Sequence, residues 1–191
     1  PIFLGSSNPP ALTSQSVGIT GVSLHAWSKN SFHQINAGLG VKIPLGKFDE
    51  KGITGVNPSF QLGTGSWDYQ LAMNYKFQKD RFAMLINTDY TIKTENKKHY
   101  QFGDQWNYSA TAFYRLWNST QSVLSGKIGL QGEVFDWNRQ FSEVMPKTAG
   151  SALYGKAGFE VSFSKLSLGT ELMLRAYTNL AGGDIEAKSR F

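Results

Sequence analysis

The sequence lacks cysteine and long apolar runs, and it is poor in charge. No cysteine occurs among its 191 residues, which excludes a disulfide scaffold, a thiolate zinc site and a cysteine nucleophile. No stretch of about 18 apolar residues occurs, so a transmembrane helix is excluded. Charged residues make up 17% of the chain, below the level of about 25% in ordinary soluble domains. Glycine, small polar and aromatic residues take their place, which favours β structure.

A concentrated positive charge and the common catalytic motifs are also absent. The net charge of +5 is spread along the chain and forms no basic run, so we expect no nucleic-acid partner. The sequence contains no Gly-x-Ser-x-Gly, P-loop, His-Glu-x-x-His or EF-hand pattern. Ser23 and His25 would point the same way along one strand at about 6.6 Å, too far for direct proton transfer. We therefore expect no enzyme and no catalytic, cofactor-binding or metal-binding residues.

The strongest positive signal is an alternation of apolar and polar residues with a period of two, which predicts β-strands. It is clearest over 66–77, where every second residue is apolar, and it resumes over 82–93. A two-residue turn at Lys79 and Asp80 would pair Phe77 with Phe82, with paired residue numbers that sum to 159. The apolar faces of the two strands then coincide, whereas a slip by one residue would set apolar against polar side chains.

The alternation predicts eight long strands joined by alternately short and long connections. The strands cover approximately 15–28, 34–43, 66–77, 82–93, 106–116, 122–138, 153–163 and 166–175. The short turns fall at 29–30, 79–80, 118–120 and 164–165, and the long polar loops fall at about 45–57, 94–105, 139–150 and 179–190. Short turns at one end and long loops at the other are typical of an antiparallel up-and-down transmembrane β-barrel of the bacterial outer membrane.

Aromatic residues gather near the strand ends, as expected of the two interfaces of a membrane. The strand from Trp67 to Phe77 would span roughly 23 Å at a tilt of about 45°, close to an apolar band of about 25 Å. The expected lipid-facing girdle consists of Trp67, Tyr69, Tyr75, Phe77, Phe82, Tyr90, Trp106 and Tyr108. The alternative is a soluble β-sandwich with the apolar face as its core. That fold is disfavoured because sandwich strands are usually shorter, about 5–6 residues.

The two ends of the chain predict that the barrel is incomplete. Pro1-Ile2-Phe3 includes no initiator methionine and no signal segment, and 182–191 reads as a loop that stops before a strand. We therefore expect one β-barrel domain over 1–191, incomplete at both ends. Because such barrels have even strand numbers, the intact barrel is expected to have about 10–14 strands, with about 12 as the best estimate.

The opposite face of the strands carries charges of both signs, which would line the barrel interior. These are Lys42, Asp68, Lys76, Asp89, Lys93, Arg115, Lys127, Glu133, Lys156, Glu160, Glu171 and Arg175. In the expected registers Asp68 faces Thr91 and is diagonal to Lys93, and Lys156 is diagonal to Glu171. One interpretation is that the charges pair to satisfy a polar interior. The other is that some of them line a constriction that filters solutes by charge.

Two short motifs resemble an outer-membrane family described as the "putative MetA pathway of phenol degradation". The first is Lys42-Ile43-Pro44-Leu45-Gly46 at a strand end, and the second is Gly63-Thr64-Gly65-Ser66-Trp67-Asp68 at a strand start after a loop. Pro44 has no amide donor and can end a strand, and the glycines permit a bend at the barrel rim. The resemblance implies passage or uptake of small solutes, hydrophobic ones among them, across the outer membrane.

Two functions remain open from the sequence. The first is a transport barrel for small solutes in the bacterial outer membrane. The second is a non-conducting structural barrel that anchors other outer-membrane proteins. Both require outer-membrane lipid as a partner, and neither requires a cofactor.

Overall fold

The computed structural model describes residues 16–28, 31–48 and 61–181, and in β1 it describes the side chains of Val22 and Leu24 alone. All regular elements in this part of the chain are β-strands. No helix among the described residues is long and apolar enough to cross a membrane. The expected turn at Lys29-Asn30, most of the loop over 45–57 and the two chain ends lie outside the described residues.

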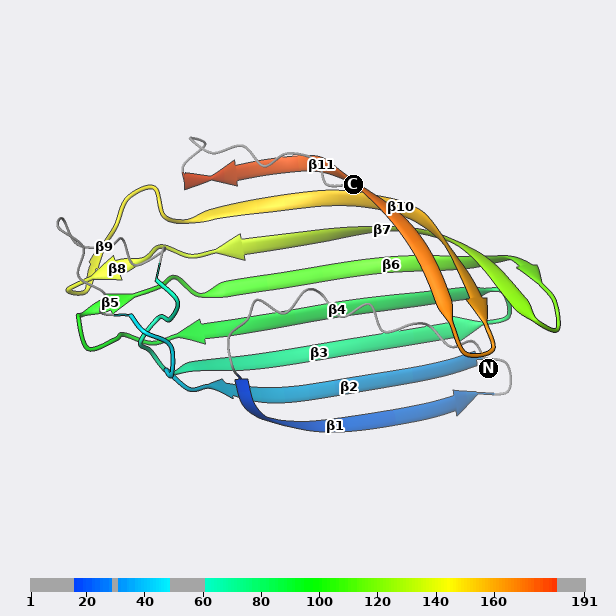
Figure 1. Cartoon of the computed structure of the whole chain (residues 1–191), viewed down its shortest axis with the longest axis horizontal. Helices are drawn as coiled ribbons and strands as arrows, with labels where there is room; N and C mark the ends of the chain where they lie inside the picture. Colours follow the sequence, from blue (N-terminus) through cyan, green and yellow to red (C-terminus); the bar gives the residue numbers. More distant parts are fainter. Residues whose placement is uncertain (1–15, 29–30, 49–60, 182–191) are drawn as a thin grey trace.

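Eight long strands form one antiparallel sheet, and each pairs with the next long strand in the sequence (Figure 1). They are β1 (Ser16–Ser28), β2 (Ser31–Lys42), β3 (Asp68–Lys79), β4 (Phe82–Lys93), β6 (Gln105–Asn118), β7 (Ser122–Phe135), β10 (Gly150–Phe163) and β11 (Ser167–Leu180). The expected all-β class, the antiparallel order and the eight long strands are therefore confirmed.

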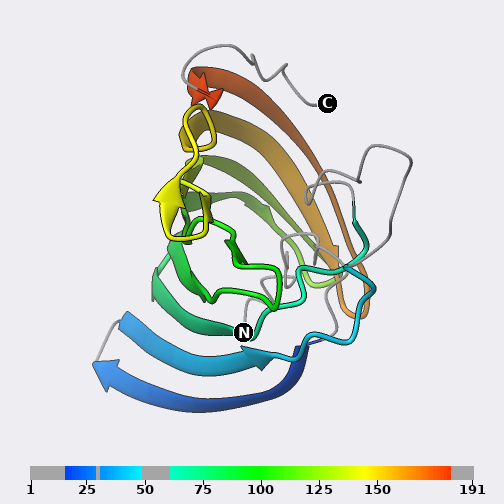
Figure 2. The same cartoon turned by 90° about the vertical axis from the view of Figure 1, so that its left-hand side faces the viewer.

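The sheet is open within the described residues. β1 pairs with β2 and β11 pairs with β10, but β1 and β11 do not pair with each other. Figure 2 shows that the sheet curves strongly around a concave face. The described strands therefore form a curved sheet and not a closed barrel.

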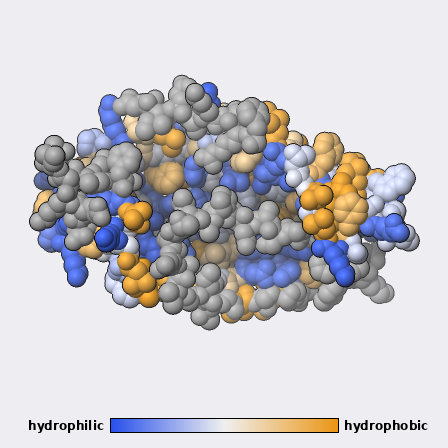
Figure 3. Space-filling model, in the orientation of Figure 1, coloured by the Kyte–Doolittle hydropathy of each residue, from blue (hydrophilic) through white to orange (hydrophobic). Residues whose placement is uncertain are grey.

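The apolar face of the sheet is exposed and the polar face is crowded. On β3, Tyr69 and Leu71 are 50% and 51% exposed, whereas Asp68 between Trp67 and Tyr69 is 0% exposed. Figure 3 looks onto the concave face, where hydrophilic side chains of the described residues gather. No second sheet covers the exposed apolar face in the part of the chain that the structure describes. The soluble sandwich alternative is therefore not the observed fold.

A small apolar core lies on the concave face. Ala83, Phe113, Ala152 and Tyr154 are at most 9% exposed, and they come from β4, β6 and β10. Curvature brings side chains on this face closer together than those on the convex face, so mixed polar and apolar residues bury one another here.

The register expected for the β3–β4 hairpin is wrong by two residues. Lys79 pairs with Phe82 and Phe77 pairs with Met84, so paired numbers sum to 161. The turn consists of Asp80 and Arg81, and Asp80 takes a φ of 50°, a conformation that Asp tolerates better than most residues. Lys79 therefore stays in the ladder, and the two-residue shift leaves every side chain on its expected face.

The last hairpin has the expected register over most of its length. Lys156 pairs with Met173 and Gly158 with Glu171, and the Phe163 amide donates to the Leu166 carbonyl across the turn at Ser164 and Lys165. A bulge between Leu153 and Tyr154 shifts the pairing near the other end of the hairpin.

Two of the expected polar loops contain short strands. β5 (Tyr100–Gln101), β8 (Arg139–Gln140) and β9 (Glu143–Val144) form a three-stranded sheet at one end of the large sheet (Figure 1). The pairing satisfies backbone groups that isolated loops would leave to water.

Candidate functional site

The buried carboxylate of Asp68 organises the loop end of the large sheet. Asp68 begins β3, and the register places it directly between Lys42 at the end of β2 and Lys93 at the end of β4. Its Oδ2 forms ion pairs with Lys42 and with Lys93, the latter at 3.6 Å. Two cations on neighbouring strands thus compensate one fully buried carboxylate.

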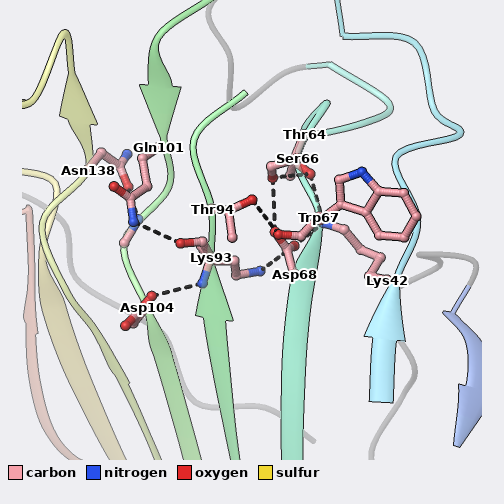
Figure 4. Close-up of polar contacts among 11 residues, drawn as sticks. Lys42, Thr64, Ser66, Trp67, Asp68, Lys93, Thr94, Gln101, Asp104 and Asn138 are labelled. Carbon is pink, nitrogen blue, oxygen red and sulfur yellow. Dashed lines mark hydrogen bonds and ion pairs between the residues drawn. The ribbon is translucent and has the colours of Figure 1, made fainter. Parts of the chain in front are cut away.

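Hydroxyl groups complete the surroundings of this carboxylate (Figure 4). Ser66 Oγ donates to Asp68 Oδ1 at 2.9 Å and lies 3.0 Å from Thr64 Oγ1. Lys42 Nζ donates to Thr64 Oγ1 at 2.7 Å. These groups, Lys42, Thr64, Ser66, Asp68 and Lys93, form what we call the rim cluster.

Further contacts fasten the segment before β3 to its neighbours. Asn96 Nδ2 donates to the Thr64 carbonyl at 2.8 Å, and Thr94 Oγ1 donates to the Trp67 carbonyl at 2.5 Å. A Cβ on Gly63 would lie 2.5 Å from the carbonyl oxygen of Gly46, so the two backbones approach as only glycine allows. The two sequence motifs therefore meet in space and hold the rim together.

A second group of polar residues joins the loops on the other side of β4. Asp104 accepts hydrogen bonds from the Lys93 amide at 2.8 Å and from the Tyr90 hydroxyl at 3.0 Å. Asn138 Nδ2 donates to the hydroxyl of Tyr100 at 2.8 Å, and burial raises the pKa of that hydroxyl. Asp104 and Asn138 carry no local sequence signal that distinguishes them from other loop residues.

An ion pair crosses a strand on the concave face. Lys127 of β7 and Glu171 of β11 are 3.1 Å apart, although β10 lies between their strands. Gly158 of β10 stands opposite both residues, and a Cβ there would lie 3.0 Å from the Cε of Lys127. The missing side chain therefore leaves room for the lysine to reach the carboxylate. Lys127, and not the diagonal Lys156, forms the ion pair with Glu171.

The other expected interior charges lie on the same face but have different partners. Asp89 accepts a hydrogen bond from Asn107 at 2.7 Å, and Glu160 accepts one from Ser162 at 3.3 Å. Lys76 lies 5.8 Å from the ring centroid of Phe32. The positions of the remaining charges follow from the strand registers. The residues opposite them are Ala152 for Glu133, Gly129 and Met173 for Lys156, Ser125 for Arg115, and Tyr154 for Arg175.

The expected girdle residues lie on the convex face near the ends of the strands. Trp67, Tyr69, Phe82, Tyr90 and Trp106 are 39–50% exposed. Tyr75, Phe77 and Tyr108 are partly buried by neighbours on the same face. His33 contributes to this packing, since its Nδ1 lies 2.9 Å from the Tyr75 hydroxyl and its ring lies 5.0 Å from that of Phe77.

A row of uncharged polar side chains crosses the concave face, and the sequence analysis missed it. Asn36, Asn74, Asn87 and Ser109 stand opposite one another on β2, β3, β4 and β6. Finding them required all three registers, since each residue alone is one polar position in an alternating strand. Among the described residues, no group of three or more His, Asp and Glu side chains is arranged to hold a metal ion.

Comparison with known proteins identifies the family. No curated protein matches the chain. The model of the family described as "Putative MetA-pathway of phenol degradation" matches residues 10–184. The match includes both motifs of the rim cluster, as the resemblance in the sequence implied. Because it covers nearly the whole sequence, the chain belongs to this family.

Proposed function

We propose that the chain forms part of a bacterial outer-membrane β-barrel that passes small solutes, hydrophobic ones among them, without catalysis of its own. One observation supports this function above all others. The curved sheet exposes its apolar side chains on the convex face and gathers its polar side chains on the concave face. This polarity is the reverse of a soluble domain and suits lipid outside and water inside.

The dimensions of the strands support the same proposal. The eight long strands contain 12 to 14 residues each. At about 3.3 Å per residue and a tilt of about 45°, such a strand spans roughly 28–33 Å, enough to cross an apolar band of about 25 Å. The proposed barrel has about 10–14 strands, with about 12 as the best estimate, since lipid leaves no partner for an unpaired sheet edge.

The family description adds weight to the choice of solute. It names a pathway that degrades phenol, a small aromatic compound, so a barrel of this family in the outer membrane could admit such compounds. The description fits passage of a small solute better than binding of a macromolecule.

The second candidate is a non-conducting barrel that anchors other outer-membrane proteins. The ion pairs of the concave face favour it, because Asp68 with two lysines joins three adjacent strands and Lys127 with Glu171 joins β7 to β11 across β10. Buried Phe113 and Tyr154 on the same face could fill part of a narrow interior.

Conductance in planar lipid bilayers separates the two candidates. The intact protein is purified from outer-membrane fractions and reconstituted. Discrete conductance steps support the transport barrel, whereas incorporation without any conductance favours the anchor. Recovery of the protein only from soluble fractions would contradict both candidates.

A further inference from the structure

The row of uncharged side chains on the concave face is a continuous chain of hydrogen bonds. Asn36 Nδ2 donates to Asn74 Oδ1 at 3.0 Å, Asn74 Nδ2 donates to Asn87 Oδ1, and Asn87 Nδ2 donates to Ser109 Oγ at 3.2 Å. Gln34 Nε2 begins the chain by donating to Asn36 Oδ1 at 3.0 Å. We call Asn36, Asn74, Asn87 and Ser109 the amide row.

All hydrogen bonds of the amide row run in one direction across the sheet. Each amide accepts from one neighbour and donates to the next, so the groups polarise one another. An amide side chain has two N–H donors and an oxygen with two lone pairs. Within the row, Asn74 and Asn87 each use one donor and one lone pair, which leaves one of each for a molecule above the sheet.

The amide row separates two charged levels of the concave face. Asp89 and Glu133 lie on their strands two residues from the level of the row, toward the loop end of the sheet. Lys76 and Lys156 lie two residues from the same level toward the turn end. The row itself continues in register through Gln131 and Tyr154 to Arg175. Of the seven positions from Asn36 to Arg175, six are uncharged, in a face otherwise rich in charge.

This chemistry selects a class of solute. A hydroxyl group is both a donor and an acceptor, so it can bond to the free N–H and the free lone pair of the same or adjacent amides. A charged solute would lose water at this level, and the three asparagines and Ser109 offer no opposite charge to replace it. The row thus favours uncharged molecules that carry hydroxyl groups.

We propose that the amide row is the selective level of the interior and that it binds uncharged, hydroxyl-bearing solutes as they pass. This inference rests on the proposed transport function and specifies its substrate class. The structural alternative is that the row only ties β2, β3, β4 and β6 together. That role would affect stability but not the choice between solutes.

The test compares two uncharged solutes of similar mass in swelling of liposomes that contain the intact protein. Sorbitol carries a hydroxyl on every carbon, whereas tetraethylene glycol carries hydroxyls only at its ends. The measured quantity is the ratio of their swelling rates, corrected for protein-free liposomes. A ratio cancels differences in the amount of protein incorporated. The double variant Asn74→Leu with Asn87→Leu removes the central amides and keeps the number and branching of the side-chain heavy atoms.

We expect the double variant to lower the sorbitol-to-glycol ratio roughly fivefold, the factor for one net hydrogen bond. The matched control is Gln70→Leu, an amide on the same face of β3 but outside the row, which should keep the wild-type ratio. If the double variant does not fold, Asn87→Thr interrupts the row with a residue that strands favour. A smaller fall of the sorbitol-to-glycol ratio is then expected.

The outcomes distinguish this inference from the proposed function. Passage of both solutes with an unchanged ratio in the folded variant overturns the inference and leaves the transport barrel standing. An equal fall of the ratio in Gln70→Leu also overturns it, because the effect would not belong to the row. Failure of the wild-type protein to pass either solute overturns both.

Discussion

The Asp68 carboxylate and the Lys93 ammonium face each other directly across the β3–β4 ladder, with Oδ2 and Nζ 3.6 Å apart. On the other side of Asp68, Lys42 closes a second ion pair across the β2–β3 ladder. The carboxylate thus ties the ends of three strands to the segment that precedes β3. Loss of its charge would leave two lysines repelling each other at a buried position.

Asp68→Asn should therefore lower the free energy of unfolding by about 3 kcal/mol, the usual cost of breaking a buried ion pair by removing one partner. Urea unfolding in lipid vesicles, followed by tryptophan fluorescence, measures the change. Asp80→Asn in the exposed turn is the matched control, and it should stay within about 0.5 kcal/mol of the wild type. Equal effects of the two substitutions would show that the rim cluster contributes little.

Gly63→Ala should destabilise the rim, because its Cβ would lie 2.5 Å from the Gly46 carbonyl oxygen and neither backbone can easily move. A loss of about 2 kcal/mol is expected from this overpacking. Gly155→Ala provides the control, since nothing lies within 4 Å of the added Cβ. That substitution should be neutral or stabilise by up to about 1 kcal/mol through the unfolded state. The same unfolding measurement compares them, and a tolerated Gly63→Ala would contradict the close approach.

Leu71→Arg tests whether the convex face meets lipid. Leu71 is the fourth residue of β3 and is 51% exposed, so a soluble protein would tolerate the change. At this depth in a bilayer the substitution should cost about 2 kcal/mol, less than the largest values at the midplane and more than those near the interface. Leu62→Arg is the control, because Leu62 precedes β3 and is 89% exposed. A negligible effect of Leu71→Arg on unfolding in vesicles would count against a transmembrane sheet.

Glu171→Gln should shift the selectivity of a conducting barrel toward anions, because it leaves Lys127 without its opposite charge. Both side chains are partly exposed, so the free energy of unfolding should change by no more than about 1 kcal/mol. Reversal potentials under a salt gradient give the permeability ratio of cations to anions. Glu143→Gln, on the exposed β9 of the small sheet, should leave that ratio unchanged. A wild-type ratio in Glu171→Gln would show that Glu171 does not filter solutes.

The sequence by itself determined which residues form the eight long strands and which side of the sheet each one faces. A period of two is a local property of an extended chain, so Tyr69 and Leu71 on one side and Asp68 on the other followed directly from their order. The antiparallel order followed too, because short turns force neighbouring strands to pair. The family motifs around Lys42 and Asp68 also indicated the position of the rim.

Only the tertiary structure decided which side chains meet. The conformation of Asp80 sets a β3–β4 register that differs by two residues from the expected one, so Lys93 and not Thr91 is the partner of Asp68. A shift of two keeps both faces intact, so the hydrophobic pattern does not oppose it. The ion pair across Gly158 and the amide row depend on several registers at once. Each register is set by its own turn or bulge, and none is encoded by the alternation within a single strand.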